Sequence, residues 1–148
     1  MQFQLISAQA LNQEWQAYIC QTNLETFGWT IAMTQSDFGL SQAYYLLVEQ
    51  DSEPCAYLSY HVMFDEVEII QVFVDPHYRQ QGIGQRMMMQ LQQTYAHIFL
   101  EVRAGNKAAI RLYEVCEFKT VAIRQNYYRQ PIEDALMMAW TQKGGKGE

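Results

Sequence analysis

The segment from Arg79 to Gln85 is the part of the sequence whose residue types and spacing point most clearly to chemistry. It reads Arg-Gln-Gln-Gly-Ile-Gly-Gln and stands between an apolar, β-favouring run and a segment with apolar residues at helical spacing. The first N–H groups of a helix are unpaired and carry partial positive charge. Gly82 and Gly84 allow a tight turn and let an anion approach the backbone, and the Arg79 guanidinium can bind a phosphate oxygen. The pattern predicts a phosphate cradle, with a tight turn that binds nothing as the alternative.

The residues around this turn exclude two common kinds of phosphate ligand. A Walker loop for nucleoside triphosphates ends in Gly-Lys followed by Ser or Thr, whereas this chain continues Gly84-Gln85-Arg86. A dinucleotide-binding fingerprint needs a third small residue where this sequence has Met87, which is large. A different phosphate-bearing ligand is therefore expected.

The strand expected before the turn, residues 67–74, contains a fault in its alternation. Val67 and Ile69 are apolar at odd positions, whereas the apolar residues that follow lie at even positions from Ile70 onward. An inserted residue moves later side chains to the opposite face, so the slip predicts a β-bulge near Ile69 and Ile70. A central strand that is buried on both faces would need no alternation and is the alternative.

The remaining pattern supplies strands and helices that alternate in the second half of the chain. Cap residues and apolar spacing predict helices that begin after Ser7, at Thr30, after Gly82 and at Asn106. Apolar, β-favouring runs predict strands at residues 3–6, 44–48, 55–63, 98–102, 118–123 and 136–140, the second and third joined as a hairpin. We therefore expect an α/β fold with a mixed sheet in one domain over residues 1–142, followed by a mobile tail at 143–148.

Composition narrows the class of partner and the compartment. The net charge of −6 argues against non-specific binding to nucleic acid. It is compatible with a cationic amine or a basic peptide as partner, or with acidity that only aids solubility. Cys20, Cys55 and Cys116 are an odd number without Cys-x-x-Cys spacing, so neither a disulfide frame nor a zinc site is expected. Because the sequence shows no leader-like start and no apolar run of membrane-spanning length, we expect a soluble cytoplasmic protein.

Two segments carry a resemblance to a known family. The Arg-x-x-Gly-x-Gly pattern at 79–84, preceded by Val-Phe-Val-Asp-Pro at 72–76, resembles motif A of the GNAT acetyltransferases. The segment that begins at Asn106 and reads Asn-x-x-Ala-x-x-x-x-Tyr-Glu resembles motif B of that family. The resemblance implies a single GNAT domain, in which helices flank a mostly antiparallel central sheet that has a bulged strand and a V-shaped gap. It also implies acetyl-CoA as the cosubstrate and no metal.

The motif positions imply how acetyl-CoA is held. The strand backbone before the turn would pair with the pantetheine arm, the amides of the turn would hold the pyrophosphate, and Asn106 would contact the cofactor arm. The cofactor-binding residues implied in this way are Val72, Phe73, Val74, Arg79, Gln80, Gln81, Gly82, Ile83, Gly84, Gln85 and Asn106.

A closer likeness is to the ribosomal-protein-alanine N-acetyltransferases, the RimI subfamily. It rests on Leu-Glu-Val-Arg at 100–103, on motif B, on Asn-Tyr-Tyr at 126–128 and on Glu-Asp-Ala-Leu-Met-Met at 133–138, whereas the first sixty residues match poorly. This likeness implies that Tyr127, Tyr128 and Glu133 help to bind an acceptor peptide. The alternatives are two rings that pack on the core and a carboxylate that faces solvent.

One position departs from the subfamily pattern. Glu117 stands before Phe118 where the subfamily usually has glycine. A turn with positive φ would be strained at a glutamate, so we expect either a strained turn or a turn of another type.

Acetyl transfer to an amine requires a base and an acid. An α-amino group has a pKa of about 8 and a lysine amine of about 10.4, so the attacking amine must lose a proton. The subfamily context favours Glu101 as the base, with Glu68 as its competitor; a surface ion pair of Glu101 with Arg103 or Lys107 is the alternative. Tyr113 is the expected general acid for the departing thiolate, and core packing is its alternative role.

The expected function is acetyl-CoA-dependent acetylation of an amine, with a protein N-terminus as the first choice of acceptor. The alternatives are acetylation of a small molecule such as a polyamine or an aminoglycoside, and a non-catalytic acyl-CoA-binding module. The protein is expected to act as a monomer or homodimer, without a direct nucleic-acid or membrane partner.

Overall fold

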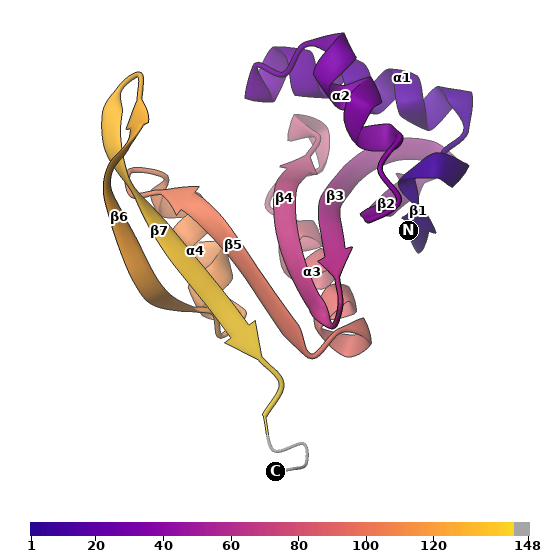
Figure 1. Ribbon diagram of the computed structural model, residues 1–148. Helices are drawn as coiled ribbons and strands as arrows, with labels where there is room; N and C mark the ends of the chain where they lie inside the picture. The colour runs from indigo at the N-terminus through magenta and orange to yellow at the C-terminus, as the bar shows by residue number, and fades with distance from the viewer. Residues whose placement is uncertain (144–148) are drawn as a thin grey trace.

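The computed structural model describes residues 1–143, in which a seven-stranded sheet carries helices on both faces (Figure 1). The strands are β1 (Gln2–Ser7), β2 (Ala43–Gln50), β3 (Glu53–Met63), β4 (Glu66–Val74), β5 (His97–Arg103), β6 (Lys119–Arg129) and β7 (Ile132–Thr141). The helices are η1 (Ala8–Ala10), α1 (Gln13–Thr22), η2 (Asn23–Phe27), α2 (Ile31–Phe38), η3 (Pro76–Tyr78), α3 (Ile83–Thr94) and α4 (Lys107–Val115). The predicted α/β fold class with a mixed sheet is confirmed.

The strand order places a parallel pair at the centre of an otherwise antiparallel sheet. The order is β1-β2-β3-β4-β5-β7-β6, and only β4 and β5 run parallel. These two strands pair over a short stretch that ends where Ile69 lies opposite Leu100. Beyond that level they diverge, and Figure 1 shows the resulting V. The V-shaped gap that the GNAT resemblance implies is present.

The predicted bulge lies in β4, immediately after its pairing with β5 ends. On the β3 side Ile69 lies opposite Tyr60 and Gln71 lies opposite Ser59, so Ile70 has no partner residue. Before the bulge the odd-numbered side chains of β4 join the core under α3 and α4; after it the even-numbered ones pack there. The slip in the apolar alternation of the sequence therefore corresponds to an inserted residue, Ile70, in the strand.

Two apolar layers hold the helices on the sheet. The larger layer lies under α3 and α4, and Met87 and Leu91 are fully buried in it, as their helical spacing predicted. The smaller layer lies under α1 and α2 and is centred on Trp15, Tyr57 and Phe73. The sheet is thus covered on both faces over β1 to β4, while β6 remains largely exposed.

Several local features differ from the sequence-based expectations. Ser7 caps only the short η1, because its hydroxyl accepts the Gln9 N–H; α1 is capped by Asn12, whose Oδ1 accepts the Trp15 N–H at 2.8 Å. The last hairpin is longer than predicted, since β6 continues to Arg129. Of the expected mobile tail, residues 144–148 lie outside the described part of the chain. Within residues 1–143, no helix has the length and apolar character needed to cross a membrane.

The turn after α4 explains how the chain tolerates Glu117 in place of glycine. Glu117 adopts a φ of 73°, the left-handed conformation that glycine favours. The Phe118 N–H then bonds the Tyr113 carbonyl at 2.9 Å, which closes the end of the helix. The chain keeps a glycine-type helix end and accepts the strain at Glu117.

Candidate active site

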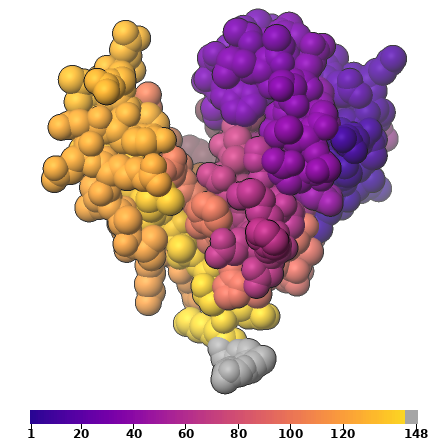
Figure 2. Space-filling model, viewed as in Figure 1, coloured from indigo at the N-terminus to yellow at the C-terminus, as the bar shows by residue number. Residues whose placement is uncertain are grey.

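A cavity of about 630 Å³ opens where β4 and β5 separate. Its walls come from the outer half of β4, the turn before α3, the end of β5, α4, the β6–β7 hairpin and η2. Figure 2 shows the hollow between the part formed by β6 and β7 and the part formed by α1 and α2. Segments that are far apart in the sequence therefore meet in a single cavity.

The turn before α3 contains backbone N–H groups that have no partner within the helix. Gly82 has a φ of 76° and precedes the helix, whose first bond runs from the Arg86 N–H to the Gly82 carbonyl. The N–H groups before Arg86 consequently have no partner within the helix. Gly84 packs closely against α4, because a Cβ there would lie 3.3 Å from the Leu112 side chain. The turn has the geometry that the sequence predicted for an anion cradle.

The predicted cofactor residues divide into two groups. Val72, Phe73, Val74, Arg79, Gln80, Gly84 and Asn106 line the cavity. Gln81, Gly82, Ile83 and Gln85 belong to the same turn but do not line it, and the Ile83 side chain is buried in the core. Of this second group, Ile83 can contact a ligand in the cavity only through its backbone.

The edge of β4 beyond the bulge offers further backbone groups. Pairing with β5 stops at Ile69, so strand groups that would bond β5 have no strand partner from Ile70 to Val74. The Arg79 side chain bonds one carbonyl in this region, because its Nε donates to the Val74 oxygen at 2.9 Å. This contact fixes the guanidinium at the cavity wall. An extended chain with amide groups can pair with such an edge in the manner of an added strand.

Asn106, at the start of α4, and Tyr113, within it, line the cavity. Asn106 caps the helix, since its Oδ1 accepts the Ala109 N–H at 3.3 Å, and its amide N–H groups remain available to a ligand. Tyr113 is 7% exposed. Burial, with a smaller contribution from Cys116, raises the pKa of Tyr113 to about 12. The phenol is therefore protonated across the neutral range and can donate a proton or a hydrogen bond.

Glu101 and Glu68 lie on the face of the sheet opposite α3 and α4, but only Glu101 lines the cavity. Glu101 forms an ion pair with Arg124 of β6, its Oε2 lying 3.5 Å from the Arg124 Nε. The sequence had offered Arg103 or Lys107 as a partner; Arg103 instead pairs with Glu133 at 3.2 Å. Among the described residues, the cavity therefore has one carboxylate at its wall, held by a cation from the last hairpin.

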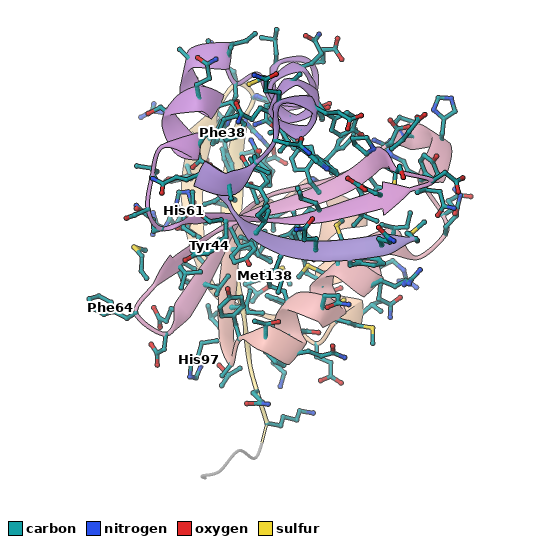
Figure 3. The ribbon with its side chains drawn as sticks, turned by 90° about the vertical axis from the view of Figure 1, so that its right-hand side faces the viewer. Phe38, Tyr44, His61, Phe64, His97 and Met138 are labelled. Atoms are coloured by element: carbon teal, nitrogen blue, oxygen red, sulfur yellow. The ribbon has the colours of Figure 1, made fainter. Side chains whose placement is uncertain are left out.

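Glu68 has a different environment. Burial raises the pKa of the Glu68 carboxyl; the nearby Glu101 adds to this and His61 opposes it. His61 lies opposite Glu68 on β3, and its Nε2 is 2.7 Å from the Asp37 Oδ1 at the end of α2. Figure 3 labels His61 and also Phe38, the last residue of α2. Glu68 thus interacts electrostatically with Glu101 at the cavity wall but does not itself line the cavity.

The β6–β7 hairpin contributes aromatic rings to the site and a carboxylate that fixes the hairpin to the end of β5. Tyr128 lines the cavity, and the Arg103 guanidinium stacks 4.0 Å from its ring centroid. Tyr127 packs edge-on against Tyr128 and remains outside the lining. The Glu133 carboxylate binds both Arg103 and the Gly105 N–H, so it ties the hairpin to the end of β5. The structure brings Tyr128 to the site directly and gives Glu133 a positioning contact.

Several lining residues escaped the sequence analysis. Thr26 and Phe27 come from η2, for which no element was predicted, although Gly28, at a φ of 70°, is a helix-end signal. Gln71 was visible only as a polar residue inside an apolar strand. No local sequence pattern would have identified Arg124 as the partner of Glu101. Within residues 1–143, no group of three or more His, Cys, Asp or Glu side chains is arranged to bind a metal ion.

Comparison with known proteins agrees with this geometry. The model of the acetyltransferase (GNAT) family matches residues 9–118. The [ribosomal protein bS18]-alanine N-acetyltransferase of Escherichia coli K12 is 34% identical over 130 residues, which cover 83% of this chain and 87% of that protein. The crystal structure of the ribosomal-protein-S18-alanine N-acetyltransferase from Escherichia coli superposes with a TM-score of 0.76, 29% identity and 99% coverage of both chains. Arabidopsis thaliana NAA60 in complex with acetyl-CoA shares the fold, with a TM-score of 0.76 at 16% identity over 95% of this chain and 97% of that one. The chain therefore belongs to the GNAT acetyltransferase family and is an N-acetyltransferase.

Proposed function

We propose that this N-acetyltransferase transfers the acetyl group of acetyl-CoA to the α-amine of a protein N-terminus, with an alanine-initiated ribosomal protein as the first candidate. The observation that carries the proposal is one cavity that joins an anion-binding turn, an unpaired strand edge, a carboxylate and a buried phenol. The choice of acceptor is supported by the Escherichia coli relative that acts on the alanine of bS18.

The cavity wall formed by β4 and α3 fits the diphosphate and pantetheine parts of acetyl-CoA. In this proposal the backbone amides at the start of α3 bind the diphosphate, helped by the Arg79 guanidinium. The edge from Val72 to Val74, where Arg79 already bonds the Val74 carbonyl, pairs through its remaining backbone groups with the amides of the pantetheine arm. Asn106 donates its amide N–H to the same arm. These positions use groups that lack partners within their own strand or helix.

Glu101 serves as the base in the proposed reaction. The attacking amine must be neutral, and Glu101 accepts its proton directly or through a water molecule. Nitrogen then attacks the thioester carbonyl, and a strand N–H near Val74 stabilises the oxyanion. The carbon–sulfur bond breaks as Tyr113 donates its proton to the departing thiolate. The products are the N-acetylated chain and CoA, and the proton on Glu101 passes to solvent while Tyr113 is reprotonated.

The acceptor side of the cavity is consistent with a peptide. Tyr128 and Phe27 face the cavity from two separate elements and supply apolar walls. Arg103, Glu133 and the Gly105 N–H hold the hairpin that carries Tyr128 in place. In the proposal Tyr127 and Glu133 support this wall, and Tyr128 contacts the peptide.

The proposal is tested by measuring thiol release from acetyl-CoA with an alanine-start peptide, set against a panel of polyamines. The matched control is the same peptide with its α-amine already acetylated, which removes the proposed acceptor and leaves every side chain in place. We expect turnover only with the free peptide, and mass spectrometry should place the acetyl group on its α-amine. Turnover with a polyamine and none with any peptide would contradict the proposed acceptor class.

A further inference from the structure

Gln71 is a buried polar side chain without a partner at the wall of the cavity. It is 5% exposed, and neither its Nε2 nor its Oε1 forms a hydrogen bond to any described residue. An unpaired buried carboxamide is costly, because it loses its bonds to water and gains none in return. Gln71 also lines the cavity. Its Nε2 and Oε1 each expose less than 1 Å², so a ligand in the cavity would supply their missing partners once the carboxamide rotates toward it.

The bulge at Ile70 turns Gln71 toward the acceptor face of the sheet. Phe73, two residues further along β4, packs in the layer under α1 and α2, whereas Val72 and Val74 pack in the layer under α3 and α4. Side chains alternate along a strand, so Gln71 shares the face of Phe73. Without the inserted residue, Gln71 would project toward the opposite layer.

The strand register brings Gln71 level with the proposed base. The last paired residues of β4 and β5 are Ile69 and Leu100, after which the strands separate. Glu101 follows Leu100 directly, and Gln71 follows Ile69 after the bulged residue. Leu100 packs under α3 and α4, so Glu101 projects from the other face, as Gln71 does. An amine at Glu101 would therefore have its next few atoms beside Gln71.

The chemistry of a carboxamide matches one acceptor class. Gln71 offers two N–H donors and one carbonyl acceptor. A protein N-terminus carries peptide carbonyl and N–H groups immediately next to its α-amine, and these complement a carboxamide. A polyamine carries no carbonyl, so it would leave the Gln71 donors unpaired. A site built to bond a group discriminates strongly against an acceptor that lacks the group.

We propose that Gln71 is an acceptor-binding residue that selects peptidyl amines by bonding the first peptide groups of the substrate. This inference rests on the proposed N-terminal acetyltransferase function and extends it to the residue that recognises the acceptor backbone. Gln71 takes no proton; it positions the α-amine at Glu101.

The test uses Gln71→Met, which keeps the length of the side chain and removes its hydrogen bonds. With an alanine-start peptide we expect the peptide KM to rise roughly 10- to 100-fold, while kcat changes less than about 3-fold and the acetyl-CoA KM is unchanged. Thermal unfolding should occur at the same or a higher temperature, because an unpaired buried amide is removed. With spermidine as the acceptor, neither the variant nor the parent should release thiol from acetyl-CoA.

Ser59→Ala is the matched control. Ser59 lies opposite Gln71 on β3, is 2% exposed and also has an unpartnered side chain, but it does not line the cavity. Its substitution should leave the peptide KM within about twofold of the parent value, since only cavity-lining groups meet the acceptor.

Four results would overturn the inference. An unchanged peptide KM in folded Gln71→Met would show that the carboxamide does not bind the acceptor. A marked fall in thermal stability, or an equal rise in KM for Ser59→Ala, would assign Gln71 to packing. A parent enzyme that acetylates no peptide N-terminus would contradict the proposed function itself, and the inference with it.

Discussion

The turn at the start of α3 and the acceptor face of β4 and β5 border the same cavity, yet they are built by different means. The turn is a continuous segment that works through backbone groups, with Gly82 and Gly84 setting its shape. The acceptor face, as we propose it, consists of side chains from separate elements, including Gln71, Glu101 and Arg124. A diphosphate can be bound by a local motif, whereas recognition of an acceptor depends on tertiary assembly.

The two regions also differ in which of their polar groups lack partners. At the start of α3 these are backbone N–H groups, whereas the side chains nearby are already engaged, since Arg79 bonds the Val74 carbonyl and Asn106 caps α4. On the acceptor face, both polar atoms of the Gln71 side chain lack a partner among the described residues. The fold thus holds the side chains beside the turn in place, while in our proposal the substrate supplies the missing partners on the acceptor face. Substitutions in the two regions should separate binding of acetyl-CoA from catalysis and acceptor binding.

The largest expected effect is from Glu101→Gln, on the acceptor face. Loss of the base should lower kcat/KM for the peptide about 1000-fold, within the range typical of general-base catalysis. Its pH profile should also change, because the residual reaction relies on amine that is already neutral. Acetyl-CoA affinity should be nearly unchanged.

Glu68→Gln provides the comparison for that prediction. Glu68 lies on the same face of the sheet as Glu101 but does not line the cavity. Its substitution should therefore lower kcat/KM for the peptide much less than Glu101→Gln does. If Glu68→Gln lowers kcat/KM as much as Glu101→Gln or more, Glu68 on the bulged strand β4 is the base.

Tyr113→Phe should show the next largest effect. Without the phenol proton, the leaving thiolate must be protonated by water, so kcat should fall about 100-fold. Calorimetry should show acetyl-CoA binding within about twofold of the parent. If the variant turns over as fast as the parent, Tyr113 only packs against Phe118 and is not the acid.

The same substitution predicts a change in stability at alkaline pH. Burial raises the pKa of Tyr113 to about 12, whereas a tyrosine in the unfolded chain ionises at about 10. The stability from this group is complete below pH 10 and is lost as the pH rises through 12. Between those values, the free energy of unfolding of Tyr113→Phe should fall less steeply than that of the parent, by about 1.4 kcal/mol per pH unit. Denaturant titrations at pH 10.5 and 11.5 measure both slopes, and equal slopes would contradict a buried, neutral phenol.

The smallest expected effect is from Glu117→Gly, distant from the acceptor face. Glycine relieves the left-handed φ of 73°, so the free energy of unfolding should rise by about 0.5–1 kcal/mol with activity unchanged. Glu114→Gly, within α4, is the control and should lower stability by about 1 kcal/mol. A loss of stability in Glu117→Gly would show that the glutamate side chain contributes more than its backbone strain costs.

Prediction from the sequence succeeded where the signal was local. The glycine spacing identified the turn, and the phase slip at Ile70 identified the bulge, because both are consequences of backbone geometry over a few residues. The pairing of Glu101 with Arg124 was not predictable, since it depends on how β6 packs beside β7 and on a register shift between Arg124 and Tyr128. The unpartnered state of Gln71 likewise depends on the register with β3 and on the separation from β5.

The central claim is that the cavity between β4 and β5 binds acetyl-CoA through the turn at the start of α3. Calorimetric titration of the parent and of Gly84→Val with acetyl-CoA tests it most directly, because a Cβ at position 84 would lie 3.3 Å from the Leu112 side chain of α4 and the two valine methyl groups add to that crowding beside the turn. The account predicts saturable one-to-one binding by the parent and a Kd at least about 10-fold higher for the folded variant. No heat with the parent, or equal affinity in the variant, would contradict it.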